Sequence, residues 1–183
     1  MAARRVGFVL AVSLALCLAA CGSSSGSSGG QGRSSGGQGQ TSSGDQAAQA
    51  DLETALRAVQ TQYQQTHDFS QAAPAELQQF STSITWLAPD IDAVPSAHQV
   101  GVSNGGDNTN QTVTLAAVST TGTCWYLVDV ASSRSETFSN GVGIQSAGVW
   151  YGHQSGAATT CNAPDNGPPD GSTLSGGWSS AHF

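Results

Sequence analysis

The feature that most constrains the fold is the run from residue 111 to residue 130, which has the pattern of two β-strands joined by a turn. In its first half, Val113, Leu115 and Ala117 alternate with polar or small residues, as in a strand with one buried face. Residues 120–122, Thr-Thr-Gly, supply the turn. The second half divides its side chains between two faces, with Cys124, Tyr126 and Val128 on one and Trp125, Leu127 and Asp129 on the other.

The segment 45–66 predicts an amphipathic helix, since its apolar residues recur at helical spacing. This stripe consists of Leu52, Ala55, Leu56, Val59 and Tyr63. Ser43 and Gln46 have the spacing of a capping box. A membrane-surface helix is disfavoured because Arg57 is its one basic residue, so we expect the stripe to lie on a sheet.

Weaker patterns complete the expected fold. A short helix is predicted at 74–80, with Pro74 at its first position. Strands are predicted at 83–87, 98–102 and 149–151, and a frayed or docked tail follows. The fold class is therefore α+β, with one N-terminal helix packed on a small antiparallel sheet of about four strands.

The first 20 residues have the pattern of an export signal rather than of folded structure. Arg4 and Arg5 precede an apolar run at 8–20 that is too short to span a bilayer as a helix. The run ends in Leu-Ala-Ala followed by Cys21, which resembles a bacterial lipobox. We therefore predict cleavage before Cys21, lipidation of this cysteine, and a Ser/Gly-rich tether over 21–44. The alternative is an ordinary secretory signal with a chance cysteine.

The composition favours the extracytoplasmic face of a cell membrane. Charged residues make up 9% of the chain, lysine is absent, and three arginines follow residue 20 against twelve acids. An acidic chain without a basic patch argues against nucleic acid as a partner.

The four cysteines have different expected fates. Cys17 lies in the apolar part of the signal and is removed with it, and Cys21 carries the lipid. Cys124 and Cys161 form an even pair in an exported domain, which predicts a disulfide. A metal site formed by these two cysteines and His153 is the less favoured alternative.

These patterns together resemble a known family. An amphipathic helix, the run Thr112-Val-Thr-Leu-Ala-Ala-Val-Ser119, the run Thr121-Gly-Thr-Cys-Trp-Tyr-Leu-Val-Asp129 and a distant cysteine are similar to the globular domain of actinobacterial type IV pilin-like proteins. The similarity covers about residues 51–163. It implies a helix on an antiparallel sheet and a C-terminal loop closed by a Cys124–Cys161 disulfide.

The N-terminus departs from the family pattern. Gly7 and Phe8 match a prepilin cleavage pair, but Val12 stands where pilins carry a glutamate, and the apolar run is short. We therefore expect a pilin-like domain at 45–163 on a lipid anchor, followed by a Pro/Gly-rich tail at 164–183.

Several motifs are weak indications of a site. Ser103 lies in a G-x-S-x-G pattern but lacks the strand–turn–helix context of a hydrolase. Asp107 and Asn108 offer oxygens for calcium, although a plain turn is the simpler interpretation. Histidines are scattered singly at 67, 98, 153 and 182. Trp125 and Trp150 are the candidate binding residues, with packing in the core as the alternative. No catalytic residue, metal ligand or cofactor is assigned.

The sequence thus predicts a non-enzymatic, surface-tethered lipoprotein whose pilin-like domain acts in envelope, pilus or secretion-type assembly. The alternative is an extracytoplasmic lipoprotein that binds a small ligand or a glycan. A secreted enzyme ranks last, because acid–base and nucleophilic residues are not clustered in the sequence.

Overall fold

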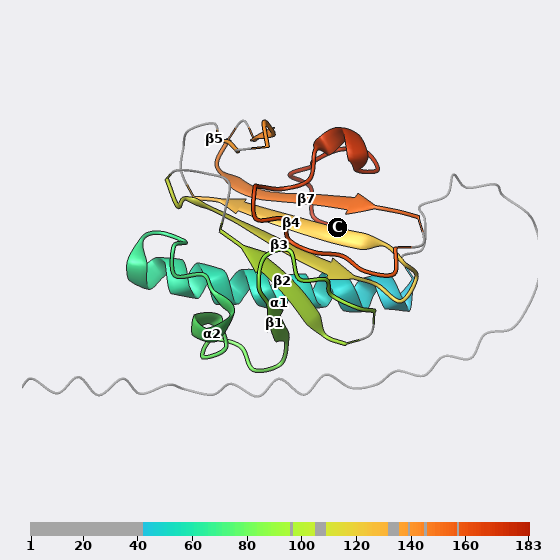
Figure 1. The fold of residues 1–183 in the computed structure, drawn as a ribbon, viewed down its shortest axis with the longest axis horizontal. Helices are drawn as coiled ribbons and strands as arrows, with labels where there is room; N and C mark the ends of the chain where they lie inside the picture. Colours follow the sequence, from blue (N-terminus) through green and yellow to red (C-terminus); the bar gives the residue numbers. More distant parts are fainter. Residues whose placement is uncertain are drawn as a thin grey trace, which may run out of the picture. The chain divides into compact units, whose positions relative to one another are not determined.

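In the part of the chain that the structure describes, one long helix packs on one face of a five-stranded sheet (Figure 1). The computed structural model describes residues 42–95, 97–104, 109–131, 136–138, 140–144, 146–156 and 158–183. The helices are α1 (Ser43–Thr66), α2 (Pro74–Leu77) and the 3-10 turn η1 (Gly171–Thr173). The main sheet has the order β1 (Thr85–Leu87), β2 (Gln99–Ser103), β3 (Thr112–Val118), β4 (Cys124–Val130) and β7 (Gly148–Gln154). A separate two-stranded sheet pairs β5 (Glu136–Thr137) with β6 (Gly143–Ile144). The predicted α+β class is confirmed.

The helix α1 begins two residues before the predicted start and ends where expected. Its cap is Ser42 rather than Ser43, since the Ser42 hydroxyl accepts the Asp45 N–H. Residue His67 ends the helix in the left-handed conformation, with its N–H bonded to the Tyr63 carbonyl. The predicted stripe faces the sheet, and Leu52 and Val59 are fully buried. Each such side chain stabilises the fold by about 1.5–3 kcal/mol.

The predicted hairpin is confirmed as β3 and β4, which pair in antiparallel register from Thr112 opposite Val130 to Val118 opposite Cys124. Gly122 has a φ of 79°, so the turn needs a residue without a side chain. The assignment of the faces of β4 also holds, because Trp125 and Leu127 belong to the core under α1. The strands differ from prediction in one respect, since every residue of β3 and β4 is buried.

The prediction of an antiparallel sheet of about four strands was wrong. The sheet has five strands and is mixed, since β1 pairs with β2 in parallel, with Thr85 opposite Gln99. Parallel neighbours need a connection that crosses over the sheet. Residues 88–98 provide it, and Ala93 within them forms a β-bridge with Cys161.

The C-terminal segment covers the face of the sheet opposite α1. Ala163 lies against Gly101 of β2, where a Cβ would come within 3.1 Å of the Ala163 nitrogen. Leu174 and Trp178 pack against Gly152 of β7, and the indole Nε1 of Trp178 donates to the Pro169 carbonyl. The segment 161–178 therefore forms a third layer, which explains why both faces of β3 and β4 are buried.

Candidate functional site

Two open cavities lie along β7, one on each side of residues 179–183. The first, of about 390 Å³, is lined by residues 146–151 together with Ser180 and His182. The second, of about 340 Å³, includes Trp125, His153 and Phe183 in its lining. Both cavities have Tyr151 and His182 in their walls. We call this surface the β7 groove, made by Trp125, Trp150, Tyr151 and His153 and occupied by residues 179–183.

Aromatic rings form the floor of the β7 groove on the α1 side. The Trp125 and His153 rings, opposite each other on β4 and β7, stack with centroids 4.9 Å apart. The Phe183 ring meets Trp125 edge-on at 5.1 Å and Tyr151 edge-on at 4.6 Å. Such edge-to-face pairs add about 0.5–1.5 kcal/mol each beyond the area they bury. The groove therefore already holds one aromatic side chain of this chain.

Acidic groups lie beneath these rings, between α1 and the sheet. The Glu53 carboxylate is 2.9 Å from the His182 Nε2. The buried Asp129 carboxylate accepts a hydrogen bond from the Gln60 amide at 3.0 Å. Burial raises the pKa of Asp129, and this hydrogen bond opposes the rise only in part. Burial, with Glu53 and Asp129 nearby, also raises the pKa of the Tyr151 hydroxyl. The Glu53 and Asp129 carboxylates therefore form an acidic seam between α1 and the sheet, and His182 lies beside it.

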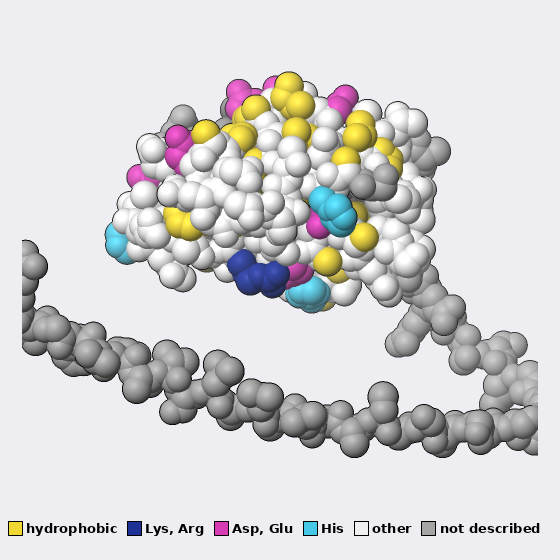
Figure 2. Space-filling view, turned by 90° about the horizontal axis from the view of Figure 1, so that it is seen from below, with side chains coloured by type: hydrophobic (Ala, Val, Ile, Leu, Met, Phe, Trp, Pro, Cys, Tyr) yellow, Lys and Arg dark blue, Asp and Glu magenta, His cyan; other side chains and the backbone are white. Residues whose placement is uncertain are grey.

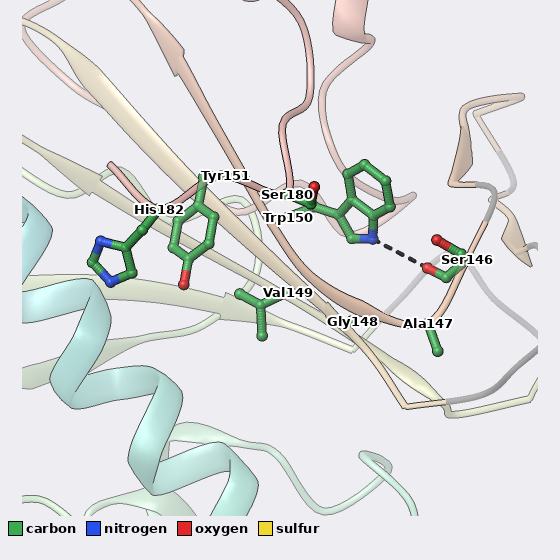
Figure 3. Close-up of a pocket in the computed structure, with 8 residues that line it drawn as sticks. All are labelled: Ser146, Ala147, Gly148, Val149, Trp150, Tyr151, Ser180 and His182. Atoms are coloured by element: carbon green, nitrogen blue, oxygen red, sulfur yellow. Dashed lines mark hydrogen bonds between the residues drawn. The ribbon is translucent and has the colours of Figure 1, made fainter.

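Figure 3 shows that neighbouring side chains of β7 point to opposite sides of the sheet. Tyr151 and Val149 point to the side of α1, whereas the Trp150 ring lies on the other side, where its Nε1 donates to the Ser146 carbonyl at 3.1 Å. Trp125 belongs to the core on the α1 side and is only 9% exposed. Trp125 lies opposite His153 and shares its face of the sheet. Trp150 is three positions before His153 on β7, so it points to the other face.

The two cysteines predicted to be bonded lie side by side as free thiols. Cys124 is on β4 and Cys161 is in the bridge to Ala93, and both are buried. The Cys161 thiol hydrogen-bonds that of Cys124, which together with burial raises the pKa of Cys161. The Cys124 Sγ also lies 3.4 Å from the Thr160 carbonyl oxygen. The fold thus brings the pair together across 37 positions of sequence, and the disulfide itself stays a prediction.

The other candidate residues are dispersed. His98 pairs with Asp51 of α1 at 3.1 Å, and His67 ends α1. Ser103 is buried at the end of β2, one residue beyond the predicted strand. The lipidation residue Cys21 and the turn residues Asp107 and Asn108 lie outside the described residues.

The sequence interpretation missed Glu53, Tyr151, His182 and Phe183 as parts of one site. Period-two spacing at 149, 151 and 153 was a signal that Tyr151 and His153 share a face. No local pattern could pair Glu53 with His182, because these residues meet only after the segment 179–183 passes around β7.

The surface around the helix is mostly uncharged. In Figure 2, hydrophobic side chains form small separate groups between polar areas, and acidic groups are more widespread than the one basic patch. Within the described ranges, no three His, Cys, Asp or Glu side chains are grouped so that they could hold a metal ion. No helix in the described part of the chain has the length and apolar character to cross a membrane.

Comparisons with known proteins give no further assignment. Neither protein-family models, nor curated proteins, nor solved structures show a match to this chain.

Proposed function

We propose that this chain is a non-enzymatic, lipid-anchored domain of pilin-like type that makes protein contacts in an envelope, pilus or secretion-type assembly. The observation that carries the proposal is the position of Cys124 beside Cys161. In the pilin-like interpretation, a disulfide at this point closes the C-terminal segment onto the sheet. The helix α1 over the opposite face supports the same arrangement.

A contact surface for such an assembly lies next to the cysteines. Ile91 and Val94, in the connection between β1 and β2, are 52% and 46% exposed. Ala93 between them forms the bridge to Cys161. A small apolar patch on a segment held by the cysteine pair suits a rigid protein–protein contact.

The test places a photo-crosslinking residue at position 91 of the full chain in the envelope of the source bacterium. We expect adducts with pilus or secretion components, and none from the same residue at position 61, an exposed site on α1. An absence of adducts from position 91 would refute the assembly role. Cys21→Ser tests the anchor separately, since the variant should leave the membrane fraction.

The 340 Å³ cavity favours a second candidate, an extracytoplasmic lipoprotein that binds a small ligand or a glycan. Its lining combines Trp125, His153 and Phe183 with the polar Gln49 and Ser179. Aromatic faces edged by hydroxyl and amide groups are suited to sugars. A tryptophan fluorescence titration with cell-wall glycan fragments should quench the signal, and a flat titration at all concentrations would exclude this candidate.

A further inference from the structure

Residues 179–183, which we call the strap, cross from one face of the sheet to the other. Trp178, just before the strap, packs in the clusters opposite α1, whereas Phe183 packs against the core under α1. Gly176 and Gly177 precede the crossing with φ values of 84° and 73°, which other residues adopt only with strain. The strap therefore follows a short glycine hinge around the outer edge of β7.

Few contacts hold the strap in the β7 groove, and all are of kinds that a separate peptide can make. Ser179 and Tyr151 exchange two backbone hydrogen bonds of 2.8 and 2.9 Å, as in an added antiparallel strand. The Phe183 ring serves as an aromatic anchor, and His182 pairs with Glu53. Strand addition with an anchoring side chain is a recurrent mode of peptide recognition.

The strap does not fill the groove that it occupies. Cavities of about 390 and 340 Å³ remain on its two sides. Residues 179–182 of the strap are exposed, so their departure from the groove would expose little additional apolar surface to water. Figure 3 shows His182 next to Tyr151 in the wall of the larger cavity.

We propose that the β7 groove is a peptide-docking site that exchanges the chain's own strap for the strap of a second copy. The second copy is the occupant that reproduces these contacts of the groove: the bridge at Tyr151, the aromatic anchor and the contact of His182 with Glu53. Rotation at the glycine hinge also moves Trp178, so the second copy's Trp178 must take the place of the chain's own against Gly152, as in a swapped dimer. The segment 171–183 has no acidic side chain, so none of its side chains repels Glu53 or Asp129.

This inference goes beyond the proposed assembly role, because it depends on the contacts of the strap alone and not on the lipid anchor. A membrane-anchored chain with no pilus partner could still exchange straps, and a strap that never exchanges would leave the assembly role untouched.

The first test measures docking of a labelled peptide by fluorescence anisotropy. The peptide carries residues 178–183 with an amidated end, and the receptor is the full chain as wild type or as Phe183→Ala. We expect the variant to bind the peptide about tenfold more tightly, because its own strap competes less. A peptide with alanine in place of Phe183 should not bind. Ile91→Ala, remote from the groove, should bind as wild type does. Absence of binding to Phe183→Ala, or equal binding of both peptides, would overturn the proposal.

The second test detects exchange in the wild-type fold, so it does not depend on a destabilised variant. A photo-crosslinking phenylalanine analogue replaces Phe183 in a mixture of ¹⁴N- and ¹⁵N-labelled chains at high concentration. Mixed-isotope adducts between residue 183 of one copy and Trp125 or Tyr151 of another support strap exchange. Adducts found only within single chains would refute it.

Discussion

Asp45 connects the start of α1 to the β3–β4 turn, so replacing it with asparagine tests how these elements are joined. One carboxylate oxygen accepts the Ser42 hydroxyl at 2.8 Å. The other accepts the Thr121 hydroxyl at 2.6 Å and the Trp125 indole N–H at 3.3 Å. Partial burial on its own would raise the pKa of Asp45, but these hydrogen bonds and one from Ser119 together lower it to about 2.

The expected loss in Asp45→Asn follows from these contacts. Asparagine has one acceptor oxygen where aspartate has two. Its amide NH₂ group must therefore face either the Ser42 hydroxyl or the Thr121 hydroxyl, and that hydroxyl loses its acceptor. A hydrogen bond to a charged group contributes about 1.5–3 kcal/mol, which water screens substantially at this partly exposed site. The favourable interaction of the charge with the helix N-terminus adds about 0.3–1 kcal/mol. We therefore expect a loss of about 1.5 kcal/mol, or roughly 5 °C in Tm.

The pH dependence separates the charge from the shape of the side chain. The native pKa of Asp45 lies below its unfolded value of 3.8, so the contribution of the carboxylate is complete above about pH 4. It is lost as the pH falls from about 4 to about 2. Urea unfolding of wild type and variant should therefore differ at pH 6 and converge near pH 2. Asp165→Asn, at an exposed acid, is the matched control. Equal stability at pH 6, or a difference that persists at pH 2, would refute the reasoning.

Three further predictions concern the cysteine pair, the back layer and the acidic seam. Oxidation of the thiols should stabilise the domain by about 4 kcal/mol on the chain-entropy model; thermal melts with and without reductant should then differ, and Cys161→Ser should abolish the difference. Gly152→Ala places a Cβ 2.6 Å from Leu174 and 3.1 Å from the Trp178 ring. It should therefore lower the free energy of unfolding by about 1–3 kcal/mol. Unchanged urea unfolding, together with unchanged proteolysis of residues 171–178, would contradict this packing. Asp129→Asn should stabilise the fold at pH 7 by about 1 kcal/mol, since burial raises the native pKa of Asp129 and penalises its charged form. That gain should shrink in urea unfolding as the pH falls and wild-type Asp129 binds a proton, and a gain independent of pH would contradict the burial argument.

The sequence was informative where neighbouring residues determine the structure. The stripe containing Leu52 and Val59 predicted α1, because helical periodicity requires only residues three or four positions apart. Alternation around Gly122 predicted β3, its turn and β4, and it placed Trp125 and Cys124 on opposite faces. The export signal, the lipid on Cys21 and the pilin-like identity remain predictions from the same local patterns.

The candidate site was only partly predictable. Trp125 was expected as a binding residue, but His153 and Phe183 cover it and leave it 9% exposed. Cys124 and Cys161 were expected to meet, and the fold brings their thiols together. The pairing of His182 with Glu53 joins residues 129 positions apart, so only the folded chain reveals it.

By itself, the sequence determined α1 and the β3–β4 hairpin, because amphipathic periodicity and turn residues act over a few positions. The tertiary structure alone decided how those elements share the sheet. Residues 88–98 cross over and make β1 parallel to β2, and the segment 161–178 buries the second face that alternation had suggested was open to solvent. The strap then wraps β7 and occupies the groove at Tyr151. These features depend on contacts between distant segments. Bringing such segments together costs chain entropy, and only the burial of surface between them offsets that cost. A local sequence pattern does not show which distant surfaces will be buried together.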